Sequence, residues 1–199
     1  MSPPDLELLT AILIGIGLSA ACGFRVFVPL LGAGIAAHLG YLPLSPEFAW
    51  LASMPALIAL SLATLLEIGA YSVPVIDHFM DAIATPIAII AGTLMMASLL
   101  GDTSPFFKWS LAIIAGGGAA GVVQIGSVLA RSGFALMTGG VGNLLVAVLE
   151  FVGAVMMTVI AIFVPLLAVS GLLVIIVLMI RWFLRRRADM GSTISGGNS

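Results

Sequence analysis

Charge is scarce in this sequence. Asp, Glu, Lys and Arg make up 8% of the 199 residues, whereas hydrophobic residues make up 61%. A soluble domain carries about 25% charged residues, because its surface has to stay hydrated. The composition therefore excludes a soluble domain and predicts an integral membrane protein of the all-α class.

Cysteine and catalytic motifs are also scarce. Cys22 is the only cysteine, which excludes an internal disulfide and a multi-cysteine metal site. The sequence has no phosphate-binding glycine loop with its lysine, no metalloprotease pair of histidines and no plausible serine nucleophile elbow. We therefore expect no enzymatic activity, no cofactor, no bound metal and no nucleic-acid partner.

Long apolar segments, in contrast, are abundant. A transmembrane helix needs about 20 mainly apolar residues, so the chain has room for about six such helices in one domain over residues 1–187. A Gly/Ser tail at 188–199 is expected to be disordered and cytoplasmic. The predicted spans lie in the blocks 6–39, 50–71, 85–100, 110–131 and 144–180, and the last block holds two of them.

Glycine and proline predict where these helices break. Block 6–39 is too long for one straight span and contains Gly23, Arg25 and Pro29 close together, so we expect a broken helix or a helical hairpin. Pro165 is expected to separate the last two spans. Pro86 is expected to limit the third span, because proline disfavours helix at the residue before it.

The arginines from Arg181 to Arg187 predict the orientation of the chain. They follow the last span directly, and positive residues favour the cytoplasmic side of a membrane. With six spans the N-terminus returns to the same side. We therefore expect both termini in the cytoplasm.

The two halves of the chain, 6–101 and 109–183, resemble each other weakly. Pro86 aligns with Pro165 and Gly92 with Gly171, at the same spacing in both halves. Three spans in each half would place the halves in opposite orientations, which is the inverted-repeat pattern of many transporters. Matches of this kind also arise by chance among apolar segments.

Three ionisable residues are predicted at membrane depth. Inserting a charged side chain there costs roughly 2.5–3.5 kcal/mol, so such a residue is kept when it faces a cavity, has a partner or serves a function. Arg25 at the helix break could bind an anion, or it could snorkel to the headgroups or pair with an acid. Glu67 and Glu150 could take up protons as in proton-coupled carriers. Alternatively, they could lie solvated at the cytoplasmic ends of their spans or cap helices there.

The segment 71–84 is predicted to be a short amphipathic connector at the cytoplasmic face. Asp77 and Asp81 are four residues apart, so a helix would place both carboxylates on one side and would need a cation such as Arg25 or Arg131 between them. The alternative is a solvated connector. If the acids have a partner, replacing them should harm the protein more than replacing Glu47, which is expected in an ordinary polar loop.

The sequence resembles a known family. The segments "GFRVFVPLL", "VPVIDHFMDAIATPIAIIAG" and "TGGVGNLLVAVLE", together with Glu67, are similar to a group of small bacterial inner-membrane proteins that is defined only as a domain of unknown function. The resemblance covers about residues 8–182. It implies a multi-pass protein of the bacterial inner membrane and no particular activity.

These patterns favour a small transporter or channel for an ion or small polar solute, surrounded by membrane lipids and working as a homo-oligomer. Arg25 would contact the solute or a counter-carboxylate, Glu67 and Glu150 would couple or gate, and Asp77 with Asp81 would line the cytoplasmic mouth. The alternative is a structural or lipid-handling subunit, in which the charges only fix the topology.

Overall fold

The computed structural model describes the backbone of residues 3–70, 74–101, 103–138 and 143–195. Side chains are described for 5–69, 83–101, 103–134, 145–178 and 180–181. Within this part of the chain every regular element is a helix, which confirms the all-α class. In chain order the elements are α1 (Pro3–Cys22), α2 (Phe27–His38), a 3₁₀ helix (Pro46–Ala52), α3 (Met54–Ala70), α4 (Pro74–Leu99), α5 (Pro105–Leu111), a π-helical segment (Ala112–Gly117), α6 (Gly118–Thr138), α7 (Asn143–Phe163) and α8 (Pro165–Ser195).

Several of these helices can cross a membrane. Three described stretches are long and apolar enough: Asp5–Cys22, Pro105–Phe134 and Leu145–Phe163. The 3₁₀ helix and α3, bent by 65° relative to each other, add a fourth if they form one span. Shorter apolar helices lie at Phe27–His38, Ile83–Leu99 and Pro165–Leu178. The protein is therefore a polytopic α-helical membrane protein.

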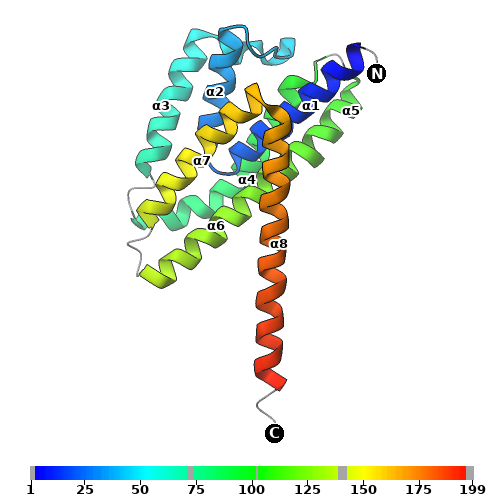
Figure 1. The fold of residues 1–199 in the computed structure, drawn as a ribbon. Helices are drawn as coiled ribbons and strands as arrows, with labels where there is room; N and C mark the ends of the chain where they lie inside the picture. Colours follow the sequence, from blue (N-terminus) through cyan, green and yellow to red (C-terminus); the bar gives the residue numbers. More distant parts are fainter. Residues whose placement is uncertain (1–2, 71–73, 102, 139–142, 196–199) are drawn as a thin grey trace.

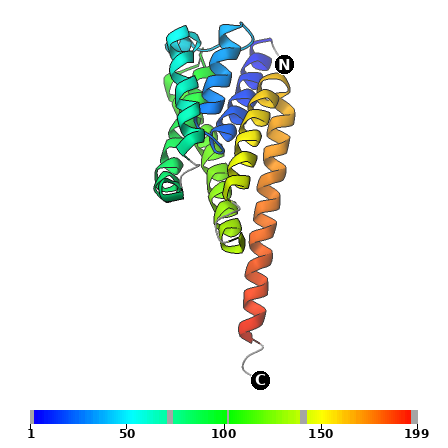
Figure 2. The same ribbon diagram turned by 90° about the vertical axis from the view of Figure 1, so that its left-hand side faces the viewer.

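The first apolar block forms a helical hairpin. Figures 1 and 2 show α1 entering the bundle from one end and α2 returning towards that same end. Between them the chain turns at residues 23–26, midway along the bundle. A Cβ at Gly23 would lie 2.5 Å from the carbonyl oxygen of Ala120 and 2.6 Å from Cβ of Val123. The absence of a side chain therefore lets the turn pack directly on α6.

The prolines have different positions in their helices. Pro29 lies in the first turn of α2, where its missing N–H costs nothing, and Pro165 is the first residue of α8. Pro86, in contrast, lies inside α4. The prediction of a break there is wrong, because packed membrane helices can tolerate an internal proline when neighbouring groups satisfy the freed backbone.

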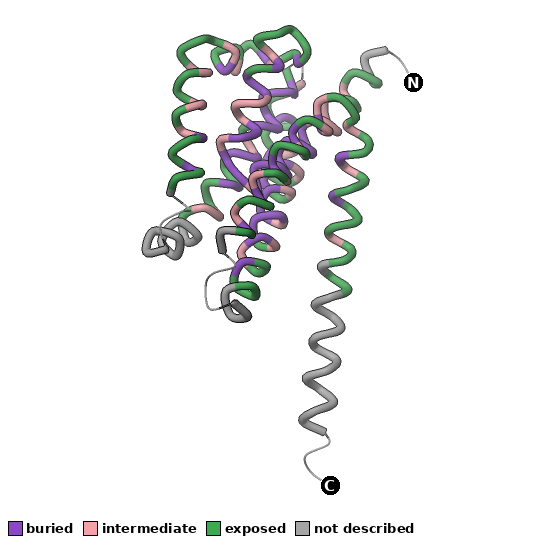
Figure 3. Tube along the Cα trace, turned by 60° about the vertical axis from the view of Figure 1, so that its left-hand side comes forward, coloured by how far each residue is buried: buried purple, intermediate pink, exposed green. Residues whose placement is uncertain are grey.

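The core lies between α1 and the helices around it. α1 packs against α2, α4, α6, α7 and α8, and Figure 3 shows the buried residues gathered in these inner helices. The hydroxyl of Ser19 donates to the carbonyl of Gly92 at 2.7 Å. A Cβ on Gly92 would lie 2.6 Å from Cβ of Ala120, so small residues bring α1, α4 and α6 into close contact.

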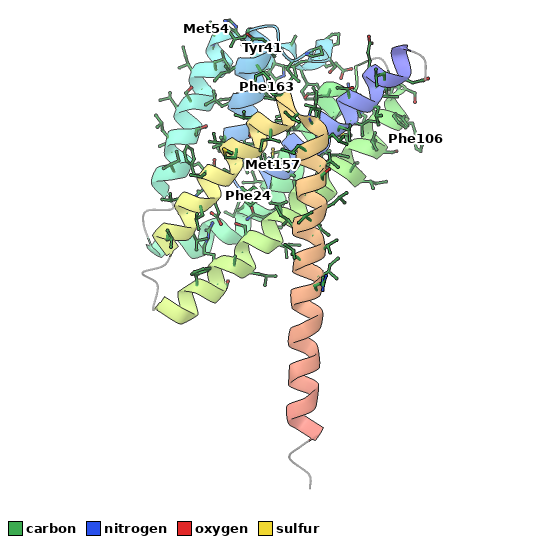
Figure 4. The ribbon with its side chains drawn as sticks, in the orientation of Figure 1. Phe24, Tyr41, Met54, Phe106, Met157 and Phe163 are labelled. Atoms are coloured by element: carbon green, nitrogen blue, oxygen red, sulfur yellow. The ribbon has the colours of Figure 1, made fainter. Side chains whose placement is uncertain are left out.

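The end of the bundle at which α1 begins is closed by aromatic and charged contacts. The ring of Tyr41, after α2, meets the ring of Phe163 edge to face at a centroid distance of 6.1 Å (Figure 4). Buried Lys108 of α5 forms an ion pair with Glu47 and lies 5.5 Å from the ring centre of Phe48. The sequence predicts an ordinary loop residue at Glu47. In the structure Glu47 instead connects the 3₁₀ helix before α3 to α5 through this ion pair.

The hairpin also decides at which end of the molecule the chain starts and stops. The start of α1 and the far end of α8 lie at opposite ends of the molecule (Figures 1 and 2). α1 and α2 together return the chain to the end where it entered, and α8 runs from that end to the other. On which side of a membrane each terminus lies stays a prediction.

Two helices are longer than the sequence predicts. α4 begins at Pro74, so most of the predicted connector 71–84 is part of this helix. α8 continues to Ser195, into the segment 188–199 that is expected to be disordered. Residues such as Leu, Arg, Ala and Met favour helix, and nothing in "RWFLRRRADM" interrupts it.

Candidate functional site

The turn between α1 and α2 exposes the N-terminus of a helix in the middle of the bundle, and a carboxylate from α3 occupies it. The N–H of Val26 donates to Oε1 of Glu67 at 2.8 Å, and the N–H of Phe27 donates to Oε2 at 3.2 Å. Since the first N–H groups of a helix have no partner within it, the carboxylate satisfies two of them and also interacts with the helix dipole. Glu67 itself is 8% exposed.

Arg25 lies in the same turn and faces α7. Its Nη2 donates to the carbonyl of Ala147 at 3.2 Å and lies 3.5 Å from Oε2 of Glu150. Arg131 of α6 forms an ion pair with the same oxygen of Glu150. Arg25, Arg131 and Glu150 are only 3%, 5% and 4% exposed, so Glu150 holds two guanidinium groups inside the protein.

Ser127 completes the contacts of Glu150, since its hydroxyl donates to Oε1. Glu67 joins them at the same turn, because it accepts from the N–H groups of the two residues that follow Arg25. We call Arg25, Glu67, Ser127, Arg131 and Glu150 the central cluster. It joins the α1–α2 turn to α3, α6 and α7, and it contains two positive and two negative side chains.

The sequence identifies part of this cluster. Arg25, Glu67 and Glu150 are predicted site residues, and the structure brings all three together. Arg131 is predicted at the end of a span, but α6 continues to Thr138 and Arg131 is buried within it. Ser127 is missed. Its spacing of four residues from Arg131 places the two side chains on one face of a helix, and this signal could have found it.

The predicted pair of aspartates cannot be placed in the cluster. The backbone of Asp77 and Asp81 belongs to α4, but their side chains lie outside the described residues. Their predicted contact with Arg25 or Arg131 therefore stays a prediction.

A pocket of about 340 Å³ adjoins the cluster. Phe24 from the turn, Ser127 from α6 and Glu150 from α7 are among its lining residues, and Ile175 and Ile176 contribute from α8. Figure 4 labels Phe24 where α6 and α7 pass each other, and its ring lies 3.9 Å from where a Cβ on Gly153 of α7 would be. The pocket is within the range of small-molecule sites, roughly 300–1,000 Å³.

Comparison with known proteins decides the family. Residues 12–185 match the family described as "Domain of unknown function (DUF4126)". The chain belongs to this family. The match includes the whole central cluster and confirms the resemblance that the sequence motifs indicate. No curated protein and no solved structure matches the chain.

Membership in the DUF4126 family assigns no activity. What the central cluster can do must therefore follow from its chemistry. It has a helix N-terminus that favours anions, two guanidinium groups that match carboxylate geometry, and two carboxylates that can each take up a proton.

Proposed function

We propose that this protein transports an ion or a small polar solute and that the central cluster is its site. The observation that carries the proposal is that α2 begins midway along the bundle. Its first N–H groups donate to the carboxylate of Glu67, which belongs to α3. Many secondary transporters bind substrate at discontinuous helices whose half-helix N-termini point at anionic groups near the middle of the membrane.

The cost of the cluster supports a functional role. Each charge at membrane depth costs several kcal/mol, and such residues are rare outside ion and substrate pathways. Charges that only fixed the topology would be expected at helix ends near the headgroups. Arg25, Arg131 and Glu150 are buried and converge from three different parts of the chain.

The arrangement suggests a role for each residue. Glu67 occupies the place of an anionic ligand at the N-terminus of α2 and acts as a gate there. Arg25 contacts the solute. Glu150 couples the binding of the solute to a proton or an ion. Asp77 and Asp81 stay candidates for the cytoplasmic mouth. A homo-oligomer in the bacterial inner membrane is the setting that we expect for this activity.

A structural or lipid-handling subunit is the competing function. It would need the apolar helix surfaces but no particular geometry at Arg25. Arg25→Lys therefore distinguishes the two functions, because it keeps the positive charge and removes the planar set of N–H donors. It should impair a transporter and leave a structural subunit intact.

Reconstitution in liposomes tests the proposal. We expect the protein to raise the flux of protons, Na⁺, K⁺, Cl⁻ or benzoate above that of empty liposomes, and Arg25→Lys to lower this flux at least tenfold. The matched control is Arg181→Lys, because Arg181 is an exposed arginine of α8, and its flux should equal that of the unchanged protein. A flux no higher than that of empty liposomes, or equal in Arg25→Lys, would refute transport through this site.

A further inference from the structure

The pocket beside the central cluster has two chemically different parts. Most of its wall is apolar, with Phe24, Val122, Gly126, Ala130, Leu149 and Ile176 among the lining residues. The polar contribution comes from Ser127 and Glu150, and Glu150 holds Arg25 and Arg131. A ligand that fills the pocket therefore needs an apolar body and a polar group at one end.

The pocket is accessible from the side of the bundle. Several of its lining residues are exposed, including Phe134 of α6, Leu149 of α7 and Ile175 of α8. Exposed apolar side chains of this kind suit contact with lipid. The pocket volume of about 340 Å³ lies at the lower end of the range for small-molecule sites, which suits a small organic acid.

We propose that this pocket binds a small amphipathic organic anion, whose carboxylate replaces that of Glu150 on Arg25 and Arg131 while Glu150 takes up one proton. The proposal names the substrate class of the site described above and thus rests on the proposed transport function.

The arginines favour an anion over a cation. Nη2 of Arg25 lies 3.5 Å from Oε2 of Glu150, and Arg131 forms an ion pair with the same oxygen. A cationic ligand would meet a carboxylate whose charge two guanidinium groups already neutralise. A carboxylate ligand instead forms the contacts that Glu150 now makes, and guanidinium groups bind carboxylates in a planar two-point geometry.

Charge balance requires the proton. An additional anion in a buried cluster has to be compensated, because an uncompensated charge inside a protein is strongly destabilising. Around Glu150 the described charged groups are Arg25 from the turn, Arg131 from α6 and Glu67 from α3, and the lining residues from α8 are apolar. A proton on Glu150 cancels the charge that the ligand brings, so the cluster keeps its net charge. An acid that arrives protonated from the lipid passes its proton to Glu150.

Binding in nanodiscs tests the ligand class with three probes of nearly equal size. Benzoate, benzylammonium and benzyl alcohol share the ring and differ in charge. Calorimetry should show that benzoate binds at least tenfold more tightly than the other two, relative to empty nanodiscs. Its Kd should rise about tenfold between pH 6 and pH 7, because one proton enters with the ligand. A Kd for benzylammonium as low as for benzoate, or a benzoate Kd that does not change with pH, overturns the proposal.

Variants test the place of binding. Ala130→Phe puts a ring into the pocket from an exposed position of α6 and should weaken benzoate binding at least tenfold. Leu129→Phe is the control, because Leu129 is the next residue, is exposed and is not among the pocket-lining residues. Equal benzoate binding by both variants refutes the pocket. Glu150→Gln should bind benzoate with no dependence on pH, and if it fails to fold the Ala130 pair still decides.

The two proposals can fail separately. Proton-linked benzoate binding without any flux in liposomes would keep the ligand class and refute transport. A flux of inorganic ions that depends on Arg25, without benzoate binding, would keep transport and refute the ligand class.

Discussion

Glu67 uses both carboxylate oxygens to hold the backbone at the start of α2. In Glu67→Gln one oxygen becomes an NH₂ group, which cannot accept a hydrogen bond. One buried N–H then loses its partner, and we expect the free energy of unfolding to fall by about 1–3 kcal/mol. Denaturant unfolding in detergent, followed by circular dichroism, measures this change.

Glu7→Gln is the control for this measurement, because Glu7 is exposed near the start of α1. It should unfold at the same denaturant concentration as the unchanged protein. Equal stability of the two variants would mean that Glu67 does not stabilise the hairpin.

At the scale of residues, the site residues could be predicted from the sequence, but most of their contacts could not. Arg25, Glu67 and Glu150 are conspicuous as charges in apolar segments. Arg25 and Glu150 are in contact although they are far apart in the sequence, and no local pattern encodes such a contact. Arg131 is misjudged for a local reason, because the end of α6 beyond it contains no strong stop signal before the "TGGVGN" segment.

At the scale of helices, two aligned glycines have different surroundings. A Cβ on Gly92 would lie 2.6 Å from Cβ of Ala120 and 2.8 Å from the carbonyl oxygen of Gly116, whereas a Cβ on Gly171 meets nothing within 4 Å. We therefore expect Gly92→Ala to lower the melting temperature. Gly171→Ala should leave it equal or raise it, because alanine favours helix by up to about 1 kcal/mol over glycine.

The same pair tests the inverted repeat. Equivalent glycines in two related halves should respond alike, so a similar loss in both variants would favour the repeat and contradict the packing described here. The prolines already differ, since Pro86 lies inside α4 and Pro165 begins α8. This alignment of the halves therefore does not match positions with equal structural roles.

Helix positions could be predicted well from apolar runs, but their ends and directions could not. The sequence identifies the break at Gly23 and leaves open whether the chain continues or returns. The choice depends on whether α2 finds partners on its way back, and here it packs against α3 and α7. That information is tertiary, as is the packing that keeps α4 helical through Pro86.

At the scale of the whole molecule, the hairpin predicts on which side of the membrane each end of the chain lies. We expect a cysteine at position 7 and one at position 41 to be labelled from the same side of the membrane, because the hairpin returns the chain to its starting side. A cysteine added after Ser199 should be labelled from the opposite side, because α8 runs to the other end of the molecule (Figure 1).

An impermeant thiol reagent applied to intact and opened spheroplasts gives the result, after Cys22 has been replaced by alanine. Cys22 is the only cysteine of the sequence, so this replacement leaves the introduced cysteine as the only thiol. Labelling of positions 7 and 41 from opposite sides would contradict the hairpin. Labelling of position 7 and the cysteine added after Ser199 from the same side would favour the six-span prediction.

The hairpin also has a consequence for how the chain is made. Its turn places Arg25 at half depth, but the carbonyl that accepts from Arg25 belongs to a residue 122 positions later. At about 5–20 residues per second, synthesis reaches that residue roughly 6–24 seconds after Arg25 has been added to the chain. During this interval the new hairpin lacks its contacts with α7. A chain that stops before α7 therefore leaves Arg25 without the carbonyl of Ala147 and the carboxylate of Glu150.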